Sequence, residues 1–168
     1  MFMHKLMLGL SVALLAGACH AQSYGLGKLA TPREVAGWNI DVAPDGRGLP
    51  KGSGSVSQGK SVYDSMCAAC HGAKGEGKPA DRLVGGKGTL NTDRPIKTIG
   101  SFWPYAPTIY DYIYRAMPYT APQSMTPDQV YAVTAYLLYL NGIVAADAMM
   151  DATTLPKVQM PNRAGFVS

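Results

Sequence analysis

The sequence predicts an all-α domain that contains long loops and carries an irregular extension at each end. Helical patterns occur at residues 57–71, 107–116 and 126–142. The last is the clearest, because Thr126 and Pro127 suit a helix start and Asn141-Gly142 a helix end. With 168 residues, 47% of them hydrophobic, the chain suits one globular domain, and 19 glycines and 12 prolines predict much loop.

Residues 1–21 have the pattern of a secretory signal peptide. Lys5 precedes an uncharged apolar stretch that is too short to span a membrane. Two cleavage sites fit, one leaving Cys19 and the other leaving Gln22 as the first residue. The segment LLAGAC also resembles a bacterial lipoprotein signal, so membrane attachment is expected only if Cys19 is lipidated. In either case we expect an exported protein.

Residues 22–55 are expected to form an irregular N-terminal arm. The segment TPREVAGW predicts one short helix, in which Thr31 is the cap, Pro32 takes the first helical position and Glu34 completes a capping box. The following segment APDGRGLPKGSGS has the composition of turns and linker. The domain proper is expected at residues 56–142.

The first helix of this domain is expected to begin at Ser57, its candidate N-cap, and to end in the segment SMCAACHG. Gly59 on this helix would allow the last helix of the domain to approach closely. The helix therefore delivers a C-x-x-C-H motif, made of Cys67, Cys70 and His71, to one place in the fold.

The motif is typical of c-type haem attachment. A structural zinc site needs four ligands, and the predicted mature chain has no second Cys/His pair to supply them. A thiol–disulfide oxidoreductase would place C-x-x-C beside a βαβ unit, which is not visible, and would leave His71 without a role. Haem attachment uses all three residues: Cys67 and Cys70 form thioethers, and His71 is the proximal iron ligand. One motif predicts one haem c.

Residues 72–101 are rich in glycine and weakly patterned, as expected of a long loop that wraps a flat cofactor. A carbonyl in this loop should accept the Nδ1–H of His71 and fix the orientation of the ring. The carbonyl that precedes Pro79 is the candidate.

The sixth iron ligand is expected to be a methionine, because no second histidine is available in the predicted domain. Pro118 ends the helix at residues 107–116 and favours an extended conformation at Met117, so its thioether can project from a rigid loop. Met117 is therefore the expected ligand. Met125, which more readily packs in the core, and Met160 in the C-terminal tail are the alternatives.

Arg115 lies at the end of the same helix, close to Met117. Its guanidinium would match the carboxylate of a haem propionate. The alternative is a solvated arginine that the helix dipole favours.

The C-terminal tail, residues 143–168, is expected to be irregular like the arm. Both ends are longer than haem wrapping requires, so we expect them either to grip a partner protein or to wrap the same domain. The formal charge of +4 is carried by scattered residues, which argues against a nucleic-acid-binding protein.

Residues 55–142 resemble class I cytochromes c. The haem helix with its C-x-x-C-H motif, the Met117-Pro118 loop and the closing helix occur in the order of that family. Longer segments resemble the cytochrome subunits of bacterial molybdenum-dependent sulfite dehydrogenases, and equally that of the sulfur dehydrogenase of the thiosulfate-oxidising system. These segments include ATPREVAGWNIDVAPDGRGLPKGSGSVSQGK, GSFWPYAPTIYDYIYRAMPYTAPQSMTPDQVYAVTAYLLYLNGIV and MDATTLPKVQMPNRAGF.

This resemblance implies a class I cytochrome c fold, ligation of iron by His71 and Met117, a periplasmic location and a molybdopterin-containing partner subunit that delivers electrons. A downstream cytochrome or oxidase is expected to receive them. Some relatives carry a second haem domain, which this chain lacks, so the resemblance leaves open which of the two systems it serves.

Two filled axial positions leave no place for a substrate, so the chain is expected to be an electron-transfer subunit rather than an enzyme by itself. One alternative is a free soluble electron carrier. The other is a haem enzyme or sensor with an open sixth site.

Overall fold

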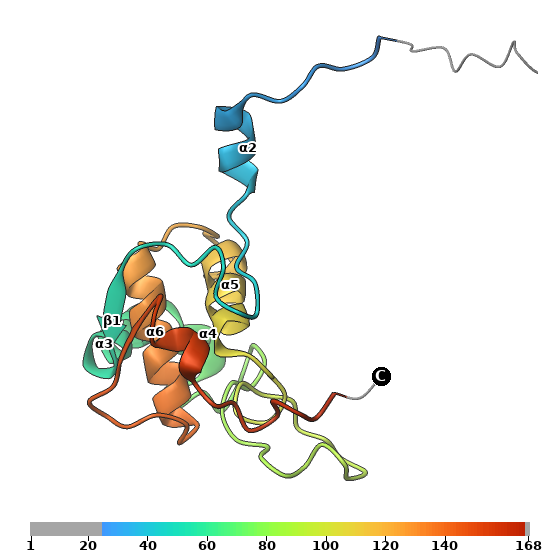
Figure 1. Ribbon diagram of the computed structural model, residues 1–168. Helices are drawn as coiled ribbons and strands as arrows, with labels where there is room; N and C mark the ends of the chain where they lie inside the picture. Colours follow the sequence, from blue (N-terminus) through green and yellow to red (C-terminus); the bar gives the residue numbers. More distant parts are fainter. Residues whose placement is uncertain (1–24, 167–168) are drawn as a thin grey trace, which may run out of the picture. The chain divides into compact units, whose positions relative to one another are not determined.

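The computed structural model describes residues 25–166 (Figure 1). The predicted signal peptide and Cys19 lie outside this range. Contacts divide the chain into a unit that ends at Val35 and a larger unit, Ala36–Ser168. No helix among the described residues is both long and apolar enough to cross a membrane.

The helix α2 (Pro32–Trp38) has the predicted capping box. The backbone N–H of Thr31 donates to Glu34 Oε2 over 2.7 Å, and the backbone N–H of Glu34 donates to Thr31 Oγ1 over 3.3 Å. None of the residues of α2 is buried. The cap therefore fixes the start of a helix that has no apolar core of its own.

The helix α3 (Val56–Met66) begins two residues earlier than predicted. Its N-cap is Ser55, whose side chain accepts the N–H of Gln58, while the Gln58 side chain accepts the N–H of Ser55. This reciprocal capping box makes Ser55 a better start than Ser57. The C-x-x-C-H motif is also not in one continuous helix: α3 ends at Met66, Cys67 is its C-cap, and the short helix α4 (Ala68–His71) follows.

The helices α5 (Ala106–Ala116) and α6 (Pro127–Leu140) match the predicted ones closely. Thr126 is the N-cap of α6, as predicted, and every residue from Val130 to Leu138 is buried. The helix α6 is therefore the centre of the fold rather than an amphipathic surface helix. It packs against α3 and also contacts α5 (Figure 1).

The contact between α3 and α6 depends on Gly59, as the sequence predicted. A Cβ atom at this position would overlap the backbone carbonyl of Ala132. The rings of Tyr63 and Tyr136 continue the contact, with 5.4 Å between their centroids. This close approach fixes the helix that leads into the haem motif.

The C-terminal tail packs on the domain. The strand β2 (Met149–Asp151) pairs antiparallel with β1 (Ser53–Ser55), and the 3₁₀-helix η1 (Leu155–Lys157) follows. Met150, Leu155 and Met160 are at most 5% exposed. These contacts favour a tail that wraps its own domain over a tail that is free to bind a partner protein. Strands of three residues each leave too short an alternation to be found in the sequence.

Two adjacent buried tyrosines differ in how their hydroxyl groups are satisfied. The rings of Tyr110 and Tyr131 lie 4.5 Å apart. The Tyr131 hydroxyl donates to the Pro50 carbonyl over 2.9 Å, whereas the Tyr110 hydroxyl has no hydrogen-bond partner among the described residues. A buried polar group without a partner is destabilising, and a satisfied one is mildly stabilising.

We therefore expect Tyr131→Phe to lower the free energy of unfolding by about 1 kcal/mol and Tyr110→Phe to leave it unchanged or raise it. Urea unfolding of the protein measures both. Burial raises the pKa of Tyr131 to about 12. The contribution of the protonated Tyr131 hydroxyl to the free energy of unfolding is therefore complete below the ordinary tyrosine pKa of about 10. It is lost as the pH rises toward 12. Equal losses in the two variants would contradict this assignment.

Candidate haem-binding site

A cavity of about 560 Å³ brings together most of the predicted site residues. This volume is in the range of cofactor sites. Cys67, Cys70, His71 and Met117 all line it, and Arg115 does not. Much of the remaining wall is apolar and comes from α5, α6 and the loop before α5: Ile99, Trp103, Ile109, Ile113, Val133 and Leu137.

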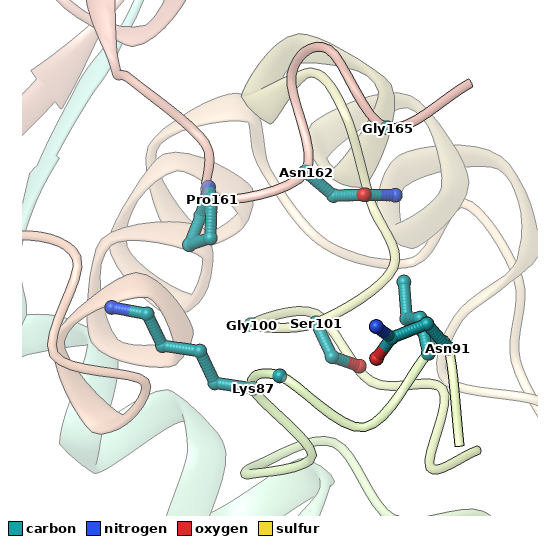
Figure 2. A pocket seen from close by; sticks show the side chains of 9 residues that line it. Lys87, Asn91, Gly100, Ser101, Pro161, Asn162 and Gly165 are labelled. Atoms are coloured by element: carbon teal, nitrogen blue, oxygen red, sulfur yellow. The ribbon is translucent and has the colours of Figure 1, made fainter. Parts of the chain in front are cut away.

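A second cavity, of about 530 Å³, lies between the loop after the haem motif and the C-terminal tail (Figure 2). Lys87, Asn91 and Ser101 line one side, and Pro161 and Asn162 the other. None of the predicted site residues lines it. The chemistry of the motif therefore belongs to the first cavity.

The His71 ring is held by a carbonyl, but not by the one that the sequence suggested. Nδ1 of His71 lies 2.7 Å from the carbonyl oxygen of Asp81, so the carbonyl before Pro79 was the wrong candidate. The loop folds back on the motif, because the N–H of Gly77 donates to the His71 carbonyl and that of Ala80 to the Cys70 carbonyl. With Nδ1 bonded in this way, Nε2 is the ring nitrogen available to iron.

The two cysteines suit thioether formation better than redox chemistry. The described residues contain no disulfide between them, and burial raises the pKa of the Cys67 thiol to about 11. The attacking thiol of a disulfide oxidoreductase has a lowered pKa. The environment of Cys67 therefore argues against the oxidoreductase alternative and fits covalent attachment to an apolar group.

Met117 is the C-cap of α5 and has an extended backbone, with φ −123° and ψ 150°. The predicted end of the helix at this residue is confirmed. Its N–H donates to the Ile113 carbonyl over 3.0 Å, which completes the last turn of α5. Met125 and Met160 are 4% and 3% exposed and belong to the core rather than to the cavity wall. Met66 does line the cavity but directly precedes Cys67.

Arg115 binds a carboxylate of the protein itself. Its Nε and Nη2 atoms donate to Asp111 over 2.9 and 2.6 Å. The cationic side chains that line the cavity are instead those of Arg82 and Lys97, which the sequence interpretation did not single out. Their position in the loop that follows a haem motif is the only signal that would have indicated them.

The comparisons with known proteins show the family of the chain. The model of the cytochrome c family matches residues 56–141. The chain belongs to the cytochrome c family. Haem c, covalently bound, is the cofactor of this family, and the cavity with its paired thiols, His71 and apolar walls fits it. The predicted haem c and class I cytochrome c fold are thereby confirmed.

A solved structure, the sulfane dehydrogenase SoxCD from Paracoccus pantotrophus, is similar to this cytochrome with 44% sequence identity and a TM-score of 0.81. The match covers 86% of this chain and 72% of that chain. It confirms the resemblance to a sulfur dehydrogenase subunit. No curated protein matches the sequence.

Proposed function

We propose that this cytochrome is the periplasmic electron-accepting subunit of a molybdenum-dependent dehydrogenase of reduced sulfur compounds. The observation that carries the electron-transfer function is the cavity that brings His71 and Met117 together with the two cysteines. The similarity to a sulfane dehydrogenase supports the sulfur-oxidising system over the sulfite dehydrogenase.

Haem supplies a one-electron Fe(III)/Fe(II) couple when bound. The Asp81 carbonyl orients the His71 ring, so that His71 would hold the iron from one side, and Met117, which lines the same cavity, would supply the second ligand. A thioether ligand favours the reduced state and raises the reduction potential. The apolar walls exclude water, and Arg82 and Lys97 are the cations suited to the propionates. With His71 and Met117 both bound to iron, the haem would transfer electrons and would offer no position for a substrate.

The test mixes the oxidised cytochrome with a molybdopterin-containing sulfane dehydrogenase subunit and its sulfur substrate. We expect rapid reduction of the haem, and slower reduction when sulfite replaces that substrate. A cytochrome that is reduced in this mixture but does not co-purify with the partner subunit would instead be a free soluble carrier. Carbon monoxide binding to the reduced protein would indicate an open sixth site.

The N-terminal arm is the expected docking segment for that partner. Leu26, Leu29 and Trp38 are 89%, 96% and 88% exposed, and α2 has no buried residue. Exposed apolar side chains of this size are typical of interaction sites. The tail is less suited to this role, because Met150, Leu155 and Met160 are buried in the domain and only Met149 and Phe166 are exposed among its large apolar side chains in the described residues.

We expect the triple change Leu26→Ser, Leu29→Ser and Trp38→Ser to weaken co-purification of the molybdenum subunit at least about tenfold, since a few apolar anchors carry most of the affinity of an interface. The absorption spectrum should not change, because none of these residues lines the haem cavity. Met149→Ser is the matched control: this residue is 56% exposed but lies on β2 in the tail. Unchanged co-purification of the triple variant would exclude the arm.

A further inference from the structure

We propose that Asp111 and Arg115, together with the backbone of Val42, form a clamp that positions Met117 for iron. Oδ1 of Asp111 accepts the Val42 N–H over 2.7 Å and Arg115 Nε over 2.9 Å. Oδ2 of Asp111 accepts Arg115 Nη2 over 2.6 Å. This inference rests on the proposed ligation by Met117. It assigns a role to three residues that do not line the haem cavity.

The clamp joins α5 to a distant part of the chain. Asp111 and Val42 are 69 residues apart in the sequence, and their hydrogen bond is buried. The Asp111 side chain is 13% exposed and that of Arg115 is 47% exposed. Hydrogen bonding to Asp111 raises the pKa of Arg115, and Asp41 adds a smaller effect in the same direction. Disturbing a buried carboxylate that accepts three hydrogen bonds costs free energy, because each lost donor leaves negative charge without a partner.

The anchor at Val42 is itself rigid. Val42 is 5% exposed and belongs to the hydrophobic core. Behind it, the N–H of Ala43 donates to the Arg47 carbonyl and that of Gly46 to the Ala43 carbonyl, both over 2.9 Å. Gly48 has φ +90°, and a Cβ atom there would overlap the Asp41 carbonyl. The clamp therefore ties α5 to a fixed turn and not to a loose segment.

The position of Met117 depends on that of α5, because Met117 is the C-cap of this helix. Arg115 precedes it by two residues, and the bond from Met117 N–H to the Ile113 carbonyl is the last of the helix. Residues 121–124, which do not line the cavity, are all exposed, so this part of the loop after Met117 has few packing contacts. A displacement of the end of α5 would therefore also displace the Met117 thioether.

The test compares the holo-proteins of Asp111→Asn and Arg115→Gln with the parent. Imidazole is the probe, since it binds the oxidised haem only when Met117 has left the iron. We expect both variants to bind imidazole about tenfold more tightly and to lose intensity in the weak sulfur-to-iron band, because a larger fraction of molecules has the site open. Arg115→Gln keeps the hydrogen bond between Asp111 and Val42. This variant alone tests the clamp if Asp111→Asn does not fold.

Two matched controls separate positioning from general stability. Asp64→Asn breaks the other i,i+4 ion pair of a helix in the described part of the domain, between Lys60 and Asp64 on α3. Ser55→Ala removes the N-cap of α3 and should lower the free energy of unfolding by about 1 kcal/mol. We expect neither to change imidazole binding. If the clamp variants bind imidazole no better than these controls, the clamp is not a positioning device. A parent protein without the sulfur-to-iron band would instead overturn the ligation by Met117.

Discussion

Replacing Met117 with alanine is expected to abolish the sulfur-to-iron band and to let carbon monoxide bind the reduced haem. Met117 is the cavity-lining methionine that is remote from Cys67 in the sequence. The apparent affinity of an external ligand equals its intrinsic affinity times the fraction of molecules whose site is open. If that fraction is about 1% in the parent, the variant should bind carbon monoxide about a hundredfold more tightly. Optical titration measures this directly.

Met125→Leu is the matched control for this experiment. Met125 is 4% exposed and packs in the hydrophobic core, and leucine conserves its volume. We expect the band to persist and carbon monoxide binding to remain weak. If Met125→Leu lost the band and Met117→Ala kept it, Met125 rather than Met117 would be the iron ligand. Absence of the band in the parent would favour the haem enzyme or sensor.

Local signals in the sequence predicted the elements that carry the site. Pro118 ends α5 at Met117, and Thr126 caps α6, because proline geometry and side-chain caps act within a few residues. The C-x-x-C-H motif is local in the same sense, since its three reactive side chains lie within five consecutive residues. These features do not depend on the rest of the fold.

The wrong candidate for the carbonyl at His71, and the ion pair of Arg115 that the sequence did not indicate, concern partners that are chosen by tertiary structure. The carbonyl of Asp81, rather than the one before Pro79, reaches His71 because the loop folds back through two backbone hydrogen bonds. Arg115 has a carboxylate on its own helix, but only the burial of Asp111 against Val42 makes that pair specific. Neither choice leaves a pattern along the chain: the Asp81 carbonyl is placed by the irregular fold of the loop after His71, and the carboxylate of Asp111 is held by Val42, 69 residues away in the sequence.

The placement of the haem motif itself depends on one small residue. Substitution of Gly59 by alanine is expected to lower the free energy of unfolding by about 3 kcal/mol, at the upper end of the usual cost of overpacking a core. The added Cβ would overlap the Ala132 carbonyl, which is backbone in the middle of α6 and cannot rotate away. Urea unfolding of the haem-loaded protein measures the loss.

Gly37→Ala is the control that separates this overlap from helix propensity. Alanine is favoured over glycine inside a helix by about 1 kcal/mol, so propensity alone would make both changes stabilising. Gly37 lies in α2, and a Cβ atom there would meet nothing within 4 Å. We therefore expect opposite signs: a neutral or small stabilising effect at Gly37 and a large loss at Gly59. If Gly59→Ala is also neutral, α3 and α6 can separate without cost, and their close contact does not hold the cysteines in place. If it is strongly destabilising, the same contact that stabilises the domain also sets where Cys67 and Cys70 meet the haem.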